Sequence, residues 1–418
     1  MASGLHVTLD KEKIKNLNCW LAEKPSMGSS ALRKVLIYLL PALAIISLIL
    51  LIAGFIHYSV FFLVLLINLG YVTTGLKMTN RIHNAVSGSY RYLSSMDSLL
   101  SVLSGESFSS EHLNRMKQQV TGDGVSAAVA VKKLGRLIQS FDSRLNVIAG
   151  FGLNSLLLWD YHCIRRLDNW KAKYREHFPV WLHIIGNIDA FSSLGNFGFN
   201  NSGFTYPSIT GNKIFSASML GHPLIDEEKR VCNDFELTMK GGICIITGAN
   251  MAGKSTFLRT VAVNYILAMT GAPVCARHLE FTPVKLFTSM RTTDSLAENE
   301  SYFYAELKRL KTLKKMILEH EPVFFILDEI LKGTNSADKS LGSVLFIKKL
   351  IPSKGTGLIA THDISLGELE KEFPDIIYNM CFEIEIENDR IIFDYRLRKG
   401  ITKKMNAALL MRQMGIID

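Results

Sequence analysis

Residues 248–256 carry the pattern of a loop that binds phosphate groups. They read GANMAGKST and fit the pattern GxxxxGK[ST]. An apolar run of strand type, residues 242–247, comes before them, and an apolar helical stretch, residues 257–269, follows. Glycines in such a loop let backbone N–H groups surround phosphate oxygens at a helix N-terminus, where the helix dipole favours anions. Because strand, loop and helix occur in the required order, we predict a nucleotide site here.

A second apolar run, residues 323–327, ends in Asp328 and Glu329. In the predicted site, Lys254 is expected to reach the β- and γ-phosphates of ATP and Ser255 to ligate Mg²⁺. An Asp at the end of a neighbouring strand can hold the Mg²⁺ shell, and the adjacent Glu can activate water. The residues therefore predict Mg²⁺-dependent ATP hydrolysis, with Lys254 and Glu329 as catalytic residues.

A third apolar run, residues 357–360, leads into Thr361 and His362. A lone histidine at a strand end is often a capping or buried residue. Because the three runs are expected to be neighbouring strands, their carboxyl ends should point at one crevice. We therefore predict that His362 senses or positions the γ-phosphate and the attacking water.

These motifs resemble those of the MutS family of DNA mismatch-repair ATPases. The loop is similar to the family's GPNMGGKST, with Ala249 and Ala252 as departures. DEILKGT at 328–334 resembles DEIGRGT, with Lys332 where the family usually has Arg, and Ala360 begins a match to the family's ATH. Several independent motifs in the same order make this resemblance specific.

The resemblance covers residues 210–418 and implies an α/β P-loop NTPase fold of the ABC/MutS type. SYFYAEL at 301–307 resembles STFMVEM, so Ser301 of one chain is implied to complete the site of the other in a head-to-tail homodimer. GHPL at 221–224 and VCND at 231–234 resemble the start of the ATPase domain, where the adenine is held. The implied nucleotide-binding residues are Gly248, Ala249, Asn250, Met251, Ala252, Gly253, Lys254, Ser255, Thr256, Val231 and Cys232. The implied metal residues are Ser255 and Asp328.

Residues 35–76 are 42 consecutive residues without Lys, Arg, Asp or Glu. A helix needs about 20 apolar residues to cross a bilayer, so the run fits two transmembrane helices, at 35–56 and 59–76. Cationic residues on both flanks put both ends in the cytoplasm. A secretory signal peptide would have a much shorter apolar region, and a buried hairpin of a soluble core is the other alternative. A further apolar stretch, residues 147–159, is expected to be the buried face of a soluble helix.

The predicted organisation has four parts. They are an N-terminal cytoplasmic segment (1–30), a transmembrane hairpin (31–78), an all-α region resembling the MutS core (79–205) and the ATPase domain (206–418). Basic residues are frequent in the all-α region, where they form either a solvated helix surface or a surface that contacts phosphates. The net charge of +9 fits nucleic acid, anionic lipid or nucleotide as partner. The six cysteines show no CxxC spacing, which favours a reducing compartment.

Two hypotheses on function remain open at this point. Mismatch readers of the MutS family use a Phe-x-Glu wedge, and this sequence contains no Phe-x-Glu. The first hypothesis is a membrane-anchored ATPase that still binds DNA, in a role like mismatch repair. The second is a membrane-tethered nucleotide switch with a protein or lipid partner and no DNA role.

Overall fold

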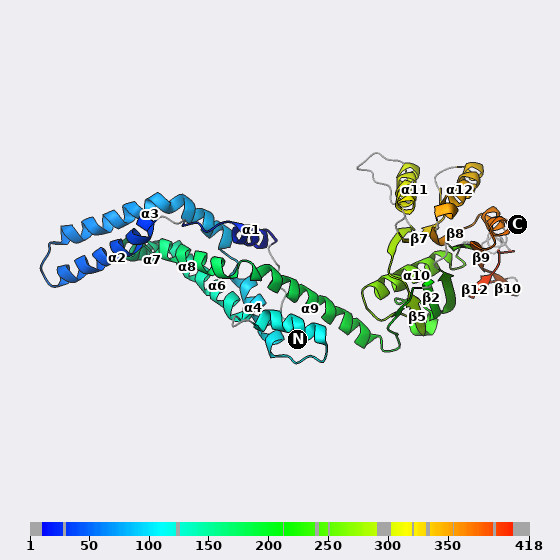
Figure 1. Ribbon diagram of the computed structural model, residues 1–418, viewed down its shortest axis with the longest axis horizontal. Coiled ribbons are helices and arrows are strands. Elements are labelled where there is room, and N and C mark those ends of the chain that lie inside the picture. The colour runs from blue at the N-terminus through cyan, green and yellow to red at the C-terminus, as the bar shows by residue number, and fades with distance from the viewer. Residues whose placement is uncertain are drawn as a thin grey trace. The chain divides into compact units, whose positions relative to one another are not determined.

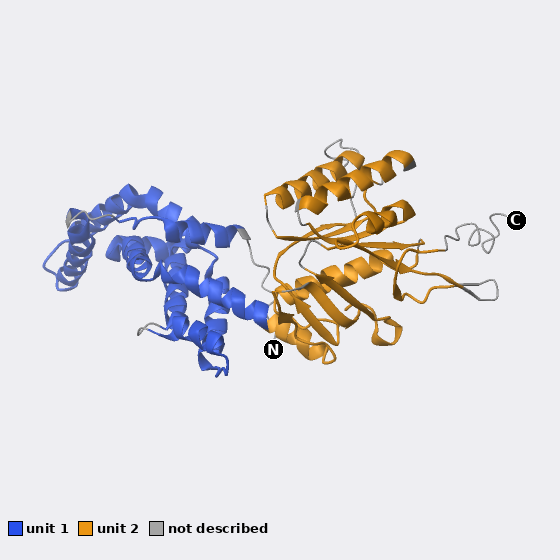
Figure 2. Cartoon of the chain, turned by 45° about the vertical axis from the view of Figure 1, so that its right-hand side comes forward, with its two compact units in different colours: residues 1–191 blue, residues 192–418 orange. Residues whose placement is uncertain are grey.

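The computed structural model describes residues 11–27, 31–122, 126–211, 213–238, 242–249, 251–290, 302–319, 322–331, 335–353, 355–387 and 390–403. The chain divides into two compact units, residues 1–191 (unit 1) and 192–418 (unit 2), shown in Figure 2. Described elements of unit 1 are helical, whereas unit 2 carries the strands. The helical region and the C-terminal α/β region predicted from the sequence are thus confirmed. The predicted boundary between the all-α region and the ATPase domain, at residues 205 and 206, remains a prediction.

Unit 1 consists of helices that pack against one another and bury a hydrophobic core between them. Its largest fully buried side chains include Trp20, Phe141 and Trp181. Buried apolar residues of the fourth and sixth helices, such as Leu100 and Leu134, recur at helical spacing. The helices are α1 (Lys11–Ala22), α2 (Ala31–Ile52), α3 (Tyr58–Val86), α4 (Tyr90–Gly105), α5 (Glu111–Thr121), α6 (Ala127–Asp142), α7 (Val147–Leu157) and α8 (Trp159–Tyr174). A ninth, α9 (His177–Asn200), crosses the division between the units.

Helices α2 and α3 form the apolar hairpin, drawn in blue in Figure 1. The first ends at Ile52, earlier than predicted, and Gly54 adopts a positive φ of 78° in the turn that follows. The second continues to Val86 instead of ending at Leu76, because no helix breaker follows and its last turns pack on the core of unit 1. Buried residues of this extension include Ile82 and Val86. The two helices are the described segments long and apolar enough to cross a membrane.

Helix α7 differs from its predicted orientation. The sequence suggests that this apolar stretch is the buried face of a soluble helix, but Val147, Ile148 and Phe151 are exposed. Its buried positions are small or polar, namely Gly150, Asn154 and Ser155. The prediction was wrong because an apolar composition does not show which side of a helix packs against the rest of the protein.

Unit 2 is built on a six-stranded sheet with the order β12-β9-β4-β8-β7-β6. All neighbours in it are parallel except β12, which is antiparallel to β9. Its strands are β4 (Ile243–Gly248), β6 (Lys285–Ser289), β7 (Val323–Asp328), β8 (Thr356–Thr361), β9 (Ile377–Phe382) and β12 (Leu397–Lys399). A second sheet has the order β1-β5-β2-β3. Its strands are β1 (Ser208–Ile209), β2 (Lys213–Leu220), β3 (Asn233–Thr238) and β5 (His278–Phe281).

The three central strands position the site. Every residue of β4, β7 and β8 is buried, as expected for parallel strands covered on both faces. They lie side by side in the order β4-β8-β7, so the predicted strands are neighbours. The remaining helices of unit 2 are α10 (Lys254–Met269), α11 (Tyr302–Leu318), α12 (Ser336–Leu350) and α13 (Leu369–Glu372). A short hairpin joins β10 (Glu385–Glu387) to β11 (Arg390–Ile392).

Candidate functional site

Strand β4 turns directly into a loop that ends at the N-terminus of α10. Two glycines make the turn possible, Gly248 with φ 153° and Gly253, the N-cap of α10, with φ 108°. A Cβ on Gly248 would lie 2.7 Å from the carbonyl oxygen of Phe382, so only glycine fits there. Met251 also has a positive φ. Asn250, predicted to bind nucleotide, lies outside the described residues.

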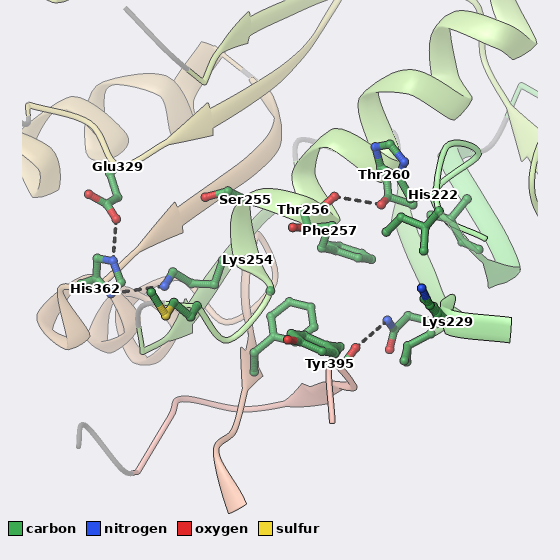
Figure 3. A pocket seen from close by; sticks show the side chains of 17 residues that line it. His222, Lys229, Lys254, Ser255, Thr256, Phe257, Thr260, Glu329, His362 and Tyr395 are labelled. Atoms are coloured by element: carbon green, nitrogen blue, oxygen red, sulfur yellow. Dashed lines mark hydrogen bonds and ion pairs between the residues drawn. The ribbon is translucent and has the colours of Figure 1, made fainter. Parts of the chain in front are cut away.

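Lys254 is buried at the first position of α10. Its Nζ donates to the carbonyl oxygens of Gly248 (2.7 Å) and Ala249 (2.8 Å). The same Nζ lies 3.2 Å from Nδ1 of His362 (Figure 3). The predicted lysine of the phosphate loop therefore faces the end of β8, as the parallel order of the strands requires.

His362 connects the loop to the carboxylate that follows β7. Its Nε2 lies 2.5 Å from Oε1 of Glu329, and its Nδ1 lies 2.9 Å from the carbonyl oxygen of Gly248. Glu329 has a positive φ of 54°, and its backbone N–H donates to the carbonyl oxygen of Ala360 in β8. A non-glycine residue in this conformation is strained, and such strain occurs at functional sites. The three predicted catalytic side chains thus form one connected group.

Asp328 suits the predicted role of a Mg²⁺-shell residue. It is buried at the end of β7, and its Oδ1 has no hydrogen-bond partner among the residues that the structure describes. A buried carboxylate oxygen without a partner is costly unless something binds it. Among the described residues no group of three or more His, Cys, Asp or Glu side chains is placed to hold a metal by itself. Asp328 and Ser255 therefore fit a Mg²⁺ ion that arrives with a phosphate ligand.

The loop lines a cavity of about 450 Å³. Predicted residues in its lining are Val231, Met251, Gly253, Lys254, Ser255, Thr256, Glu329 and His362. Five other predicted residues are described but do not belong to this lining, namely Cys232, Gly248, Ala249, Ala252 and Asp328. Ser301, predicted to act across a dimer, lies outside the described residues.

Further residues of the lining were not predicted as site residues, although His222 and Asn233 lie in the segments that resemble the start of the ATPase domain. They include Leu220, His222, Lys229, Asn233, Phe382 and Tyr395. Asn233 ties two of these segments together, because its Nδ2 donates to the carbonyl oxygen of Tyr395 (3.0 Å) and its Oδ1 accepts from the N–H of Leu397 (2.7 Å). Tyr395 lies against the phosphate loop, since a Cβ on Gly253 would be 3.1 Å from its ring. An aromatic ring beside the loop suits a nucleotide base.

His222 adds a titratable group to this lining. Burial lowers its pKa below the ordinary value, and the nearby Arg259 and Arg230 lower it further. Its Nδ1 accepts a hydrogen bond from the backbone N–H of Leu224 (3.2 Å). Both effects favour the neutral imidazole.

Glu306 on α11 is another residue to which the motifs assigned no role. Its side chain is buried, and Oε1 accepts a hydrogen bond of 2.6 Å from the backbone N–H of Leu331. Leu331, like Glu329, has a positive φ (62°). Glu306 therefore fixes the strained segment that carries the candidate catalytic carboxylate.

Fold and site define the class of the protein. A parallel sheet, a phosphate loop at a helix N-terminus and an acidic pair at the end of a neighbouring strand are the features of a P-loop nucleotide-binding protein. MutS domain V matches residues 244–414. The chain belongs to the MutS family, as its motifs indicate.

Individual relatives agree with this assignment. The DNA mismatch repair protein MutS of Finegoldia magna is 34% identical over 230 residues, which are 53% of this chain and 26% of that protein. MutS of Persephonella marina is 31% identical over 283 residues, 67% of this chain and 32% of that protein. MutS protein homolog 4 of Homo sapiens is 31% identical over 199 residues, 45% of this chain and 21% of that protein. The chain thus spans less than a third of the length of these relatives.

Proposed function

We propose that this chain is a membrane-anchored ATPase that binds ATP with Mg²⁺ in the cavity of unit 2 and hydrolyses it. The observation that carries the proposal is the connected group Lys254–His362–Glu329 beside the partnerless oxygen of Asp328.

Each side chain then has a distinct task. Lys254 exchanges its loop carbonyls for phosphate oxygens, and Ser255 with Asp328 holds the metal. Mg²⁺, when bound, neutralises charge that develops on the phosphates. Glu329 accepts a proton from the attacking water, and His362 holds that carboxylate through the 2.5 Å contact.

Head-to-tail dimerisation is part of the proposal. MutS-type motifs imply that Ser301, just before α11, serves the site of a second copy. Glu306 on the same helix bonds to the segment of Glu329, which gives a physical path from such a seam to the carboxylate. The Mg²⁺·ATP site and the dimer seam would then respond to each other.

Membrane anchoring rests on α2 and α3. In the most apolar 18 residues of each helix, only 22% (α2) and 17% (α3) are buried. The core helix of a soluble protein would be mostly buried, so the exposed apolar side chains favour a lipid environment. We place both ends of the hairpin and the ATPase domain in the cytoplasm, because Arg33 and Lys77 flank the apolar run.

DNA binding is the partner that we favour, since the relatives are named for DNA mismatch repair. On α6, Lys132, Lys133 and Arg136 are exposed on one side of the helix. Such a cationic row suits phosphate contacts that do not depend on base sequence.

Other basic residues of unit 1 favour the alternative, a nucleotide switch with a lipid or protein partner. Lys171 is buried over the ring of Trp20 (4.6 Å), and its Nζ donates to the Trp20 carbonyl oxygen. Arg165 stacks on Tyr38 of α2 (4.8 Å). Because these cations serve the internal packing of unit 1, the net charge alone does not establish a DNA surface.

ATP hydrolysis by the purified full chain, with and without duplex DNA over a salt series, tests the proposal. We expect hydrolysis that requires Mg²⁺ and increases with matched or mismatched duplex at low salt. Replacing Lys132, Lys133 and Arg136 with Gln should remove the stimulation, whereas replacing Lys311, Lys314 and Lys315 of α11 with Gln should not. Hydrolysis that ignores DNA at every salt concentration would support the switch, and no hydrolysis at all would overturn the ATPase.

A further inference from the structure

Helix α7 has the reverse polarity of a helix on the surface of a protein in water. Its exposed residues are Val147 (82%), Ile148 (87%) and Phe151 (62%). Its buried residues are Gly150, Asn154 and Ser155. A surface helix in water buries its apolar stripe and exposes polar residues. The reversed pattern is the one expected where the surroundings are hydrocarbon.

Polar groups of α7 bond within the protein. The Nδ2 of Asn154 donates to the carbonyl oxygen of Gly150 (3.0 Å), and its Oδ1 accepts from the backbone N–H of Asp160 (3.0 Å). The Nδ2 of Asn68, in the apolar part of α3, donates to the carbonyl oxygen of Ser155 (2.7 Å). Buried side-chain amides that bond across helices are a common way to join helices inside a membrane.

Two contacts place α7 along α3. Just before α7, the Nη2 of Arg144 donates to Oδ1 of Asn80 (3.0 Å), and near its end Ser155 bonds to Asn68. The helices therefore run antiparallel, and the C-terminal end of α7 lies deepest in the apolar part of α3. Asn68 is about 14 Å along the helix from Lys77, the first charged residue after the apolar run. That depth is about half of the hydrocarbon core.

The length of α7 fits the same depth. Its 11 residues extend about 16 Å, too short to cross a bilayer. The chain then turns at Leu158, which has a left-handed conformation (φ 50°), and continues into α8. Arg144 at the beginning and Asp160 after the turn form an ion pair (3.2 Å), which joins the two ends of the segment.

We propose that α7 is a third membrane-embedded element, a re-entrant helix that enters the cytoplasmic leaflet beside α3 and returns through Leu158. Acyl chains cover its exposed face, because α7 packs against both α2 and α3, and all three helices expose large apolar side chains. This inference rests on the proposed anchoring by α2 and α3.

Depth-dependent fluorescence quenching tests it in the full chain, reconstituted into phosphatidylcholine vesicles. Single cysteines replace Phe151, Leu66 of α3 or Val129 of α6, whose exposures are closely matched at 62%, 64% and 66%. Cys19, an exposed native cysteine, is replaced by Ser, and that parent protein provides the labelling blank. Each cysteine carries an environment-sensitive fluorophore, and the quencher is a nitroxide attached to the lipid acyl chain.

We expect loss of fluorescence at positions 66 and 151 and none at 129. Quenching at position 66 without quenching at position 151 would overturn the re-entrant helix and leave the anchor intact. The same result is expected if a second copy or another protein, and not lipid, covers position 151. No quenching at either position would overturn the anchor and the inference with it. ATP binding by each variant is the folding control. Fluorescence lost equally at all three positions in variants that bind ATP would overturn the inference, because contact with lipid would then not distinguish α7 from α6.

Discussion

The central strands of unit 2 bury their apolar side chains, whereas the hairpin of unit 1 exposes residues of the same types. Ile326 of β7 is fully buried, and Ile46 of α2 is 52% exposed. The free-energy cost of exposing an apolar side chain is large in water and small in lipid. The same apolar residues are therefore buried if unit 2 folds in water and exposed if the hairpin lies in lipid. Exposure of apolar groups therefore supports the proposed lipid environment of the hairpin, which composition alone does not.

The largest expected effect is a loss of ATP hydrolysis that leaves membrane binding unchanged. Lys254→Ala should reduce ATP hydrolysis to the level of a blank, because the ammonium that binds the phosphates is lost. Phosphate release measures this, and the membrane-bound fraction of the protein should not change. Lys349→Ala, at an exposed lysine of α12, is the control. Full activity in Lys254→Ala would contradict the assignment of the nucleotide site to unit 2.

Glu329→Gln should lower hydrolysis by about 10²–10⁴-fold, the range of a lost general base. ATP binding should remain, since the glutamine keeps the shape of the side chain. Nucleotide binding measured by filter retention distinguishes this variant from Lys254→Ala. Glu319→Gln, at an exposed glutamate after α11, should behave like the parent. Normal turnover in Glu329→Gln would contradict the assigned role.

A matched pair of substitutions tests the comparison directly. Ile326→Ala should destabilise unit 2 by about 2–5 kcal/mol, because it leaves a cavity in a packed core. Ile46→Ala should change stability little in detergent, since its side chain faces the surroundings and makes few internal contacts. Urea unfolding of both variants provides the measurement. Equal destabilisation would show that α2 is a core helix of a soluble protein.

Glu306→Gln should have a smaller effect on turnover. Loss of the charged acceptor for the N–H of Leu331 weakens a buried hydrogen bond, which is worth about 1–3 kcal/mol. We expect kcat to fall by about tenfold per 1.4 kcal/mol that reaches the transition state. KM for ATP should change little, because Glu306 does not line the cavity. A rise in KM alone would contradict a positioning role.

The smallest expected effect depends on pH. The pKa of His222 lies below that of an exposed histidine, so the unfolded chain binds more protons between the two values. Its contribution to stability is therefore complete above a pH of about 6.5 and is lost as the pH falls through the window below it. His222→Gln should flatten that part of the stability curve, as measured by thermal unfolding at several pH values. An unchanged curve would show that His222 titrates normally.

Sequence patterns predicted those parts of the site whose residues lie close together in the chain. The phosphate loop, the acidic pair and His362 each follow a buried strand, and parallel strands bring their ends together. Tyr395 and Glu306 depend on contacts between distant segments, which no local spacing encodes. Helix α7 was misjudged for a different reason. Its apolar residues suit both a protein core and a surface that faces lipid. Only the burial of Asn154 and Ser155 shows which side of the helix faces the protein.

The hydrogen bonds from Lys254 to Gly248 and Ala249 have a thermodynamic consequence. In the proposed function, nucleotide binding at this loop is a substitution reaction, in which phosphate oxygens displace two backbone carbonyls from one ammonium group. The affinity is then set by the difference between two sets of bonds, and the heat of binding should be smaller than the number of new contacts suggests. Variants that loosen the loop carbonyls should tighten nucleotide binding without adding any contact to the ligand.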